Sequence, residues 1–388
     1  MAEFSKWVAC WGNATSIIDQ TACTFAKDLT LRYPIKMCFD AGKIRIRLSN
    51  ITGTESVVLK AGVARTSDGR DIDSSTFKSL SLDGNDSIEI KPGEEVTTDE
   101  IEYEVKRGEM IAISLYLPTY TQMNSGVLIT GPLSRGYYTY GNYMDKDSLP
   151  LDLTRNTNWF YFLNTIDVFT EEKNHALICY GDSITAQSWP DYLTLRLEEE
   201  NIDNLSVIRR AVSGTRILRE YSCITYAAYG IKGEKRFPVE VNTSGADRVI
   251  IQHGINDIIH PVGVDVNPFR PWEDLPSVEE MTQGIENFYV KVARQKGLKV
   301  YGGTLLPIYG WRTYADFRET LRNDFNSWML STPVFDDVVD FDAAVCDKED
   351  RRKFAPGFDS GDHLHPSESA YKAMAECVPE ELLTMTDD

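Results

Sequence analysis

The sequence predicts two domains of different class, an all-β sandwich over residues 1–170 and an α/β domain with a parallel sheet over residues 171–388. The length of 388 residues exceeds what one hydrophobic core ordinarily serves. In the first half, hydrophobic residues recur at every second position within short runs. In the second half, short apolar runs alternate with stripes at helical spacing.

The clearest alternation in the first half places Ile44, Ile46 and Leu48 on one face of an extended segment, with arginines between them. Turns rich in Gly, Asp and Pro separate such runs, which is typical of an antiparallel sandwich. Strands are predicted over residues 42–50, 56–64, 87–90, 101–105 and 110–117. The stretch 119–158 has little periodicity and is predicted to form long loops. An aromatic run at 159–163 begins a last strand, and 171–174 is the predicted linker.

The second half predicts strands at residues 175–180, 205–212, 248–253, 299–305 and 338–341. Helical stripes fall at 189–197, 281–292 and 314–328, and a last helix has Pro366 in its first turn. Strand–helix repeats of this length indicate a parallel sheet covered on both sides.

Composition limits the classes of partner. The formal net charge of −19 argues against nucleic acid or an anionic membrane, because phosphate binding needs a basic surface. No apolar stretch approaches the length of a membrane span, and the N-terminus lacks the pattern of a secretory signal. The seven cysteines are scattered and form no Cys-x-x-Cys pair, which favours reduced thiols and a cytoplasmic location.

Candidate catalytic residues fall where predicted strands end, and in an open parallel sheet ligands bind beyond those ends. Ser183 follows the first strand of the α/β half at a glycine-containing turn. A serine hydroxyl is a poor nucleophile without a neighbouring base, and His365 can be that base. Asp362, three residues earlier, can hold the imidazole by its other nitrogen. Acidification should then slow the reaction, because a protonated His365 cannot accept the serine proton.

Acyl transfer also needs donors for the oxyanion of the tetrahedral intermediate. The backbone N–H groups of Ser183 and Gly214 and the side-chain amide of Asn256 are suitable candidates. Loss of one such donor typically costs about 3 kcal/mol of transition-state stabilisation.

Two alternatives concern the histidines. His363 is a second imidazole on the same turn as His365. A zinc site built from His363, His365 and Asp362 with His253 or His260 is a second interpretation. The Ser-His-Asp set explains the same residues without a metal, so neither a metal nor a cofactor is expected.

A long connection at 258–280 is rich in proline and aromatic residues. Long loops in compact domains are often functional, so this connection and residues 309–311 are candidates for the wall of the substrate site. The alternative, with equal support in the sequence, is that these segments pack as ordinary surface loops.

The motifs together resemble those of the SGNH or GDSL-type esterases and lipases over residues 175–378. They are Gly181-Asp-Ser-Ile184, the lone Gly214, Gly254-Ile-Asn-Asp257 and the Asp-x-x-His-Pro run at 362–366. The resemblance implies a three-layer, flavodoxin-like domain with a five-stranded sheet and no cofactor. It also implies Ser183 as nucleophile, Asp362 and His365 as its partners, and Gly214 and Asn256 in the oxyanion hole. Ile184 departs from the commoner Leu.

The first half is similar to the jelly-roll domain that precedes the catalytic domain in some bacterial members, several of which remove acetyl groups from carbohydrates. The predicted function is therefore hydrolysis of a short-chain acyl ester, with a small molecule or an acetylated carbohydrate as substrate. A lipase or thioesterase for longer chains and a catalytically silent glycan-binding protein are the alternatives. The β domain is expected to buttress the catalytic domain rather than to bind sugar.

Overall fold

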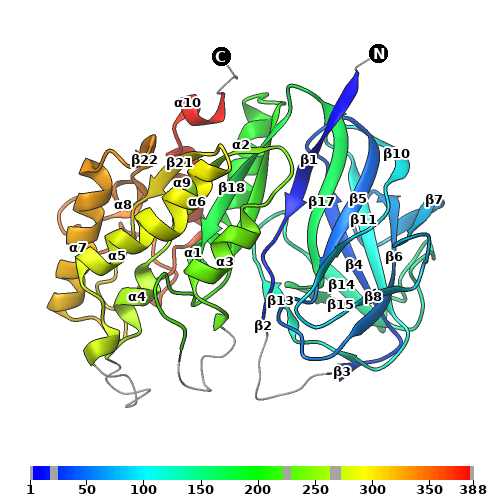
Figure 1. The fold of residues 1–388 in the computed structure, drawn as a ribbon, viewed down its shortest axis with the longest axis horizontal. Helices are drawn as coiled ribbons and strands as arrows, with labels where there is room; N and C mark the ends of the chain where they lie inside the picture. Colours follow the sequence, from blue (N-terminus) through cyan, green and yellow to red (C-terminus); the bar gives the residue numbers. More distant parts are fainter. Residues whose placement is uncertain (1–2, 18–24, 222–228, 263–271, 385–388) are drawn as a thin grey trace. The chain divides into compact units, whose positions relative to one another are not determined.

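A computed structural model describes residues 3–17, 25–221, 229–262 and 272–384 (Figure 1). The chain divides into two compact units. One comprises Met1–Ala176 with Asp203–Ile208, and the other comprises Leu177–Ile202 with Arg209–Asp388. We call them the β unit and the α/β unit.

Two large antiparallel sheets form most of the β unit, as the alternating sequence pattern predicts, and two smaller sheets complete it. The first sheet has the order β1-β17-β5-β10, with β9 beside β5. Its strands are β1 (Phe4–Gly12), β5 (Ala41–Ser49), β9 (Glu95–Thr97), β10 (Ile101–Val105) and β17 (Leu163–Glu171). The second has the order β15-β14-β4-β11-β6-β7, with β8 beside β6. Its strands are β4 (Leu29–Lys36), β6 (Val57–Thr66), β7 (Ile72–Leu80), β8 (Ile88–Ile90), β11 (Met110–Leu117), β14 (Gly136–Tyr140) and β15 (Arg155–Thr157).

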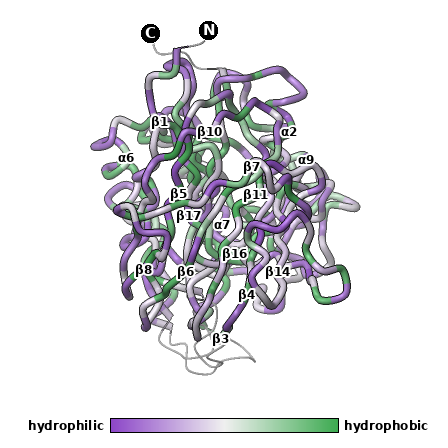
Figure 2. Tube along the Cα trace, turned by 90° about the vertical axis from the view of Figure 1, so that its right-hand side faces the viewer, coloured by the Kyte–Doolittle hydropathy of each residue, from purple (hydrophilic) through white to green (hydrophobic). Residues whose placement is uncertain are grey.

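The alternation predicted for the segment around Ile44 is confirmed in β5. Ile44, Ile46 and Leu48 are fully buried, because every second side chain of a strand points to the same face. Arg45 stays on the other face, where its Nε lies 3.2 Å from Oδ2 of Asp167 on β17. Figure 2 shows hydrophobic and hydrophilic residues interspersed along the chain, as expected of strands with one buried face.

The prediction of long loops over residues 119–158 is wrong in part. The stretch contains β14 and β15 of the second sheet, and also β12 (Thr121–Gln122) and β13 (Ser125–Leu128). β12 pairs with β3 (Phe25–Ala26), and β13 lies between β2 (Ser16–Ile17) and β16 (Trp159–Tyr161). Strands of two to five residues carry too little periodicity to be recognised, and β14 is held by pairing with the distant β4.

A five-stranded sheet with the order β19-β18-β20-β21-β22 forms the centre of the α/β fold. Its strands are β18 (His175–Gly181), β19 (Leu205–Ala211), β20 (Ala246–Gln252), β21 (Lys299–Gly303) and β22 (Asp337–Val339). Numbered along the chain, this is the order 2-1-3-4-5 of a flavodoxin-like sheet, which confirms the predicted class. The order reverses between β18 and β20, and such a reversal opens a crevice at the carboxyl ends of the two strands.

Helices flank this sheet (Figure 1). They are α1 (Ser183–Ala186), α2 (Trp189–Glu199), α3 (Gly233–Glu240), α4 (Ile255–Ile259), α5 (Val278–Gly284), α6 (Lys291–Gln295), α7 (Asp316–Ser331), α8 (Phe341–Val345), α9 (Glu368–Glu376) and α10 (Glu380–Leu383), with a π-helical turn at Ile285–Val290 and a 3₁₀ turn at Trp272–Asp274. The predicted stripes correspond to α2, to α5 through α6, and to α7. Pro366 lies before α9 rather than in its first turn, because Ser367 is the N-cap and accepts from the Ala370 N–H.

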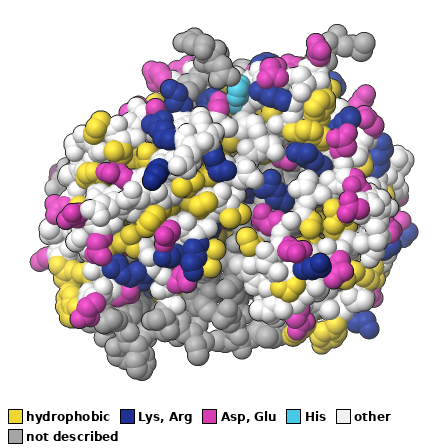
Figure 3. Space-filling model, viewed as in Figure 1, with side chains coloured by type: hydrophobic (Ala, Val, Ile, Leu, Met, Phe, Trp, Pro, Cys, Tyr) yellow, Lys and Arg dark blue, Asp and Glu magenta, His cyan; other side chains and the backbone are white. Residues whose placement is uncertain are grey.

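Charges of both signs are interspersed on the face shown in Figure 3, where the described residues gather into no extended basic patch. In the part of the chain that the structure describes, no helix is both long and apolar enough to cross a membrane. The described cysteines are free thiols, and Cys23 and Cys223 lie outside the described residues. The cytoplasmic location stays a prediction.

Candidate active site

Ser183 lies at the switch point of the sheet, directly beyond the end of β18. The chain turns there because Asp182 caps α1, its Oδ1 accepting from the Ile184 N–H at 3.1 Å. Only glycine fits at position 181, because other atoms approach its backbone closely. A Cβ at this position would lie 2.4 Å from Thr185 Oγ1 and 2.5 Å from the carbonyl oxygen of Gln252. Ser183 is therefore the first residue of a helical turn at the crevice.

A continuous hydrogen-bonded chain joins the three predicted catalytic side chains. Ser183 Oγ lies 2.9 Å from Nε2 of His365. The other ring nitrogen of His365, Nδ1, lies 2.6 Å from Oδ2 of Asp362. This geometry allows the imidazole to accept the serine proton while the carboxylate stabilises the resulting cation.

Asp362 is held as an anion by its surroundings. Partial burial works to raise its pKa, but hydrogen bonds from the His365 ring and from backbone N–H groups outweigh burial and hold the pKa below its usual range. Its Oδ1 accepts from the N–H groups of Leu364 and His365 at 2.9 and 2.8 Å. The turn thus fixes both the charge of Asp362 and the direction of the imidazole.

Gly214 and Asn256 line the same cavity as Ser183 and His365, with a volume of about 220 Å³. Gly214 has a φ of 80°, and a Cβ there would lie 2.1 Å from the ring of Tyr229, so both conformation and space require glycine. Asn256 is 2% exposed in the first turn of α4. Its Nδ2 donates to the Thr215 carbonyl at 3.1 Å, and an amide has a second N–H for a ligand.

Asp257 and His253 are not reacting groups but supports of the segment that follows Gly214. Asp257 accepts from the N–H groups of Ile217 and Leu218 at 2.7 and 3.2 Å. The His253 ring is fully buried, with Nε2 3.0 Å from Thr215 Oγ1 and Nδ1 2.8 Å from the Tyr289 hydroxyl. Burial, with the nearby Arg236, lowers the pKa of His253 to about 3, so the ring is neutral.

Arg236 of α3 braces the two loops that meet at the cavity. Its Nη2 donates to the Gly181 carbonyl at 2.8 Å and lies 3.4 Å from Thr215 Oγ1. Its Nη1 pairs with Glu240 at 2.8 Å. Both side chains of this ion pair are at least nine-tenths buried. Arg236 therefore links the turn of Ser183 to the loop of Gly214 through buried hydrogen bonds, and Glu240 holds its guanidinium in place.

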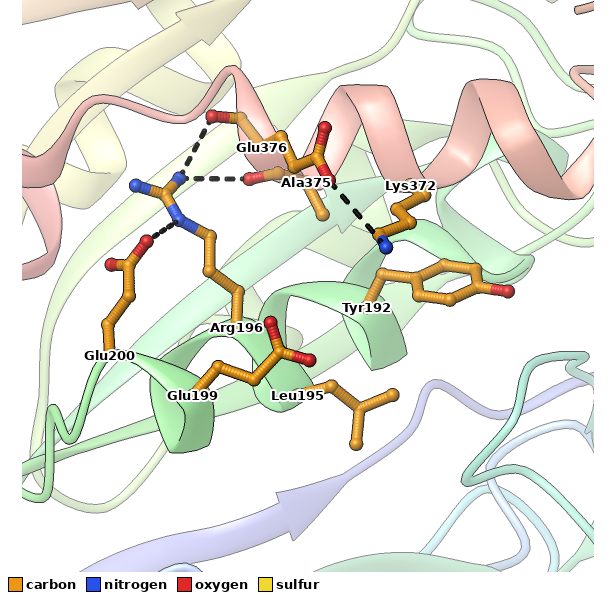
Figure 4. Close-up of a pocket in the computed structure, with 8 residues that line it drawn as sticks. All are labelled: Tyr192, Leu195, Arg196, Glu199, Glu200, Lys372, Ala375 and Glu376. Atoms are coloured by element: carbon orange, nitrogen blue, oxygen red, sulfur yellow. Dashed lines mark hydrogen bonds and ion pairs between the residues drawn. The ribbon is translucent and has the colours of Figure 1, made fainter.

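The helix that follows His365 is fastened to the helix that follows Ser183. Glu368, in the first turn of α9, accepts from Ser188 Oγ at 2.8 Å and from the Tyr192 hydroxyl at 3.0 Å. At the other end of α9, Arg196 of α2 donates to the carbonyls of Ala375 and Glu376, each at 3.1 Å (Figure 4). These contacts satisfy carbonyls that a helix end leaves without partners and fix α9, and with it His365.

Tyr229, His260, Trp311 and Arg312 complete the wall of the cavity. The His260 ring lies 5.5 Å from that of Tyr229, and the Trp311 ring meets His365 edge to face at 6.5 Å. The exposed Arg312 guanidinium lies 4.7 Å over Trp311. The predicted wall is thus present at His260 and Trp311. Residues 263–271 of the same connection lie outside the described residues.

His363 takes no part in the chain of hydrogen bonds. Its side chain is 50% exposed and pairs through Nδ1 with Asp359 at 2.5 Å. The zinc interpretation fits poorly, because both ring nitrogens of His365 and of His253 already have partners. Across the described ranges, no cluster of three or more His, Cys, Asp or Glu residues is arranged to hold a metal ion.

Four of the five predicted site residues therefore line one cavity, and the fifth, Asp362, is hydrogen-bonded to one of them, His365. The catalytic roles of all five stay predictions. Sequence reasoning missed Tyr229, Arg236 and Glu368. Arg236 and Glu240 are four residues apart, which is a recognisable signal for an ion pair on a helix, but Pro238 between them hides the helix. Tyr229 has no signal in the sequence.

A parallel sheet of this order, with a serine, a histidine and an aspartate hydrogen-bonded at its switch point, is the arrangement expected of a serine hydrolase with a flavodoxin-like sheet. The model of the GDSL-like lipase/acylhydrolase family matches residues 179–373. The chain belongs to that family, and it is an acylhydrolase acting on esters.

Solved structures similar to the chain are distant. An acetylxylan esterase from Geobacillus stearothermophilus is 17% identical, with 55% of this chain and 95% of that one covered and a TM-score of 0.37. An alpha/beta hydrolase enzyme from the metagenome of Lake Arreo, Spain, is 16% identical, with 54% and 94% covered and a TM-score of 0.39. No curated protein matches the chain.

Proposed function

We propose that this acylhydrolase removes short acyl groups, with acetyl esters of carbohydrates as the leading substrate class. The observation that carries the proposal is the Ser183–His365–Asp362 chain opening into a cavity of about 220 Å³. Pockets for drug-sized ligands usually measure about 300–1,000 Å³. A cavity below that range favours a small acyl group over a long hydrocarbon chain.

The proposed reaction follows from the atoms that meet there. Ser183 Oγ attacks the acyl carbon while His365 Nε2 takes the serine proton, and the N–H groups of Ser183, Gly214 and Asn256 receive the negative charge on oxygen. The C–O bond to the alcohol breaks, and the alcohol leaves with the proton from His365. Water then attacks the acyl-enzyme with His365 again as base, which releases the acid and restores the serine.

The walls of the cavity support a hydroxylated alcohol as leaving group. Trp311 and Tyr229 offer aromatic surface, and Gln187 and Arg312 offer hydrogen-bond donors. These groups suit a sugar ring, which has apolar C–H faces and a rim of hydroxyls.

The test is hydrolysis of p-nitrophenyl esters from acetate to palmitate, together with acetate release from acetylated xylo-oligosaccharides. Wild type should prefer acetate to octanoate by more than tenfold, and Ser183→Ala should lose activity while keeping its melting temperature. Equal activity of the two proteins would remove Ser183 from the reaction. A preference for long chains would favour the lipase or thioesterase alternative. Absence of turnover on every ester would favour the silent glycan-binding alternative.

A further inference from the structure

A second cavity lies wholly within the β unit and belongs to no part of the catalytic chemistry. Its volume is about 530 Å³, within the range of about 300–1,000 Å³ that ligand pockets occupy. Residues from β3, β4, β13, β14, β15 and β16 line it. We call it the aromatic groove.

The walls of the aromatic groove break the ordinary pattern of a half-buried sheet. On β14, the buried Thr139 points inward, and Tyr138 and Tyr140 point to the other face. On β16, Phe160 is 1% exposed and stacks on Tyr33 in the core at 4.5 Å.

The two neighbours of Phe160, Trp159 and Tyr161, line the groove with their ring centroids 6.5 Å apart. Outward positions of such a strand are normally polar. Here Tyr138, Tyr140, Trp159 and Tyr161 occupy them, and Tyr140 remains 62% exposed. Tyr138, Trp159 and Tyr161 are half-buried and Tyr140 is exposed, so none of the four rings belongs to the closed core.

Several polar groups of the groove are not used by the protein itself, although Asn158 Nδ2 donates to the Ser134 carbonyl at 2.8 Å and Thr157 Oγ1 accepts from the Trp159 N–H at 3.0 Å. Within the described residues, no hydrogen bond engages the hydroxyls of Tyr138, Tyr140 and Tyr161, the indole N–H of Trp159 or the side-chain amide of Asn156. The exposed Asn156 reaches the groove from β15. Together these groups supply both donors and acceptors at the edge of an aromatic surface.

Among the described residues that line the groove, none carries a formal charge. None of these is Asp, Glu, Lys, Arg or His, in a chain of which 26% is charged. A ligand with a net charge would gain no ion pair there, so the chemistry fits a neutral molecule with apolar faces and many hydroxyls.

We infer that the aromatic groove is a binding site for a neutral oligosaccharide. A pyranose ring presents C–H faces that pack on Tyr and Trp, and its hydroxyls can both donate to and accept from Asn156 and the phenol groups. A saturated acyl chain would leave these polar atoms without partners. A proline-rich segment offers carbonyl acceptors but no backbone N–H for the amide oxygen of Asn156. This inference concerns binding alone and goes beyond the proposed esterase activity.

The test uses the full chain in native gels that contain a neutral, unacetylated polysaccharide, in turn arabinoxylan, glucomannan, galactomannan and mixed-linkage glucan. At least one should retard the protein. Calorimetry with the matching hexasaccharide then gives the dissociation constant. Trp159→Ala and Tyr138→Ala should each raise it about tenfold, since each removes an aromatic face. Ser183→Ala should bind as wild type does, which separates this test from that of the esterase.

Matched controls show whether the groove is responsible. Trp272→Ala removes another exposed tryptophan and Leu153→Ala another exposed apolar side chain of the β unit, and neither residue lines the groove. Both should keep the wild-type dissociation constant. If Trp159→Ala fails to fold, Tyr140→Ala and Asn156→Asp replace it, because both side chains are exposed.

Three outcomes would overturn the inference. One is that none of the four polysaccharides retards the protein. The second is binding that the groove variants leave unchanged. The third is tighter binding of decaproline or of decanoate than of any hexasaccharide, which would assign the groove to a peptide or to an acyl chain.

Discussion

The turn that carries His365 lies at the surface and is held by hydrogen bonds between near neighbours, whereas the loops that carry Ser183, Gly214 and Asn256 are buried and braced from a distance. In the turn, Asp362 bonds to the N–H groups two and three residues later. In the loops, Arg236 reaches the carbonyl of Gly181, 55 residues away in sequence. The comparison indicates that the Asp362–His365 pair is oriented locally, although α9 behind it is held by α2, whereas the loops of the nucleophile side depend on tertiary contacts throughout.

This difference has a physical cause. The base must move protons, and an exposed turn with a fixed carboxylate orients the imidazole without burying a charge pair. Oxyanion donors must already point at the cavity when charge develops, which requires rigid loops in a site from which water is largely excluded. Substitutions on the two sides should therefore have different effects. Those on the turn should mainly reduce activity, and those on the buried loops should reduce stability to a greater degree.

The largest effect is expected on the turn. His365→Ala should lower kcat by about four to six orders of magnitude, because the serine loses its base. His363→Ala is the matched control on the same turn and should keep activity within about threefold, since that ring lies outside the cavity. Steady-state hydrolysis of p-nitrophenyl acetate measures both, and thermal unfolding should change little in either. A larger loss in His363→Ala than in His365→Ala would reverse the assignment.

On the buried side, Arg236→Met should destabilise the α/β unit by about 3–5 kcal/mol, because the buried Glu240 carboxylate loses its ion pair with Arg236. Urea unfolding measures this loss. The double variant Arg236→Met/Glu240→Leu should recover most of the stability, since neither member of this buried pair then carries a charge. Lys372→Met breaks an exposed pair and should cost less than about 1 kcal/mol. Equal losses in the buried and exposed variants would show that Arg236 braces nothing.

The same contrast explains what the sequence can and cannot predict. Asp362 and His365 are three residues apart and fall on one turn, so their partnership can be read from spacing. The parallel sheet follows from strand–helix repeats of sufficient length, whereas its flavodoxin-like form is implied only by the family resemblance. The brace through Arg236 depends on atoms that only the folded chain brings together. In the β unit, the sequence pattern does not predict β4, because Pro34 interrupts the strand pattern. A proline has no N–H for the ladder, and only the pairing of β4 with its neighbours in the folded sheet holds it in a strand.

Asn256→Ala tests the donor that the buried loops position. It should lower kcat by about 10²–10³-fold with little change in KM, because the amide acts on the oxyanion and not on the ground-state ester. The loss corresponds to about 3 kcal/mol, smaller than that of the base. Stability should also fall slightly, since the bond to the Thr215 carbonyl disappears. A change confined to KM would place Asn256 in substrate binding instead.

The smallest predicted effect concerns how the free energy of unfolding depends on pH on the two sides of the site. Burial raises the pKa of Asp182 to about 7, against opposing contributions from the Ile184 N–H, His365 and Arg236. The folded chain therefore holds this proton more tightly than the unfolded chain, and Asp182 costs stability progressively as pH rises from about 4 towards 7. Asp182→Asn keeps an oxygen that can cap α1 but removes the titration.

The free energy of unfolding of Asp182→Asn, relative to wild type, should increase by about 2–3 kcal/mol between pH 5 and pH 8. The reason is that, between the two pKa values, only the folded wild type holds the proton of Asp182. Its free energy of unfolding therefore falls by about 1.4 kcal/mol for each pH unit until the pKa of the folded chain is reached. Urea denaturation at four pH values across the range measures the difference.

Asp362→Asn changes a carboxyl on the exposed turn whose pKa is shifted in the opposite direction, downwards. The lowered pKa of Asp362 contributes stability that is present at pH 5 and above and is lost only on strong acidification. Its variant should therefore be less stable than wild type by a nearly constant amount from pH 5 to pH 8. A flat difference for Asp182→Asn would mean that this carboxyl is already ionised in the folded protein, and the buried loops would then tolerate a charge that their surroundings should oppose.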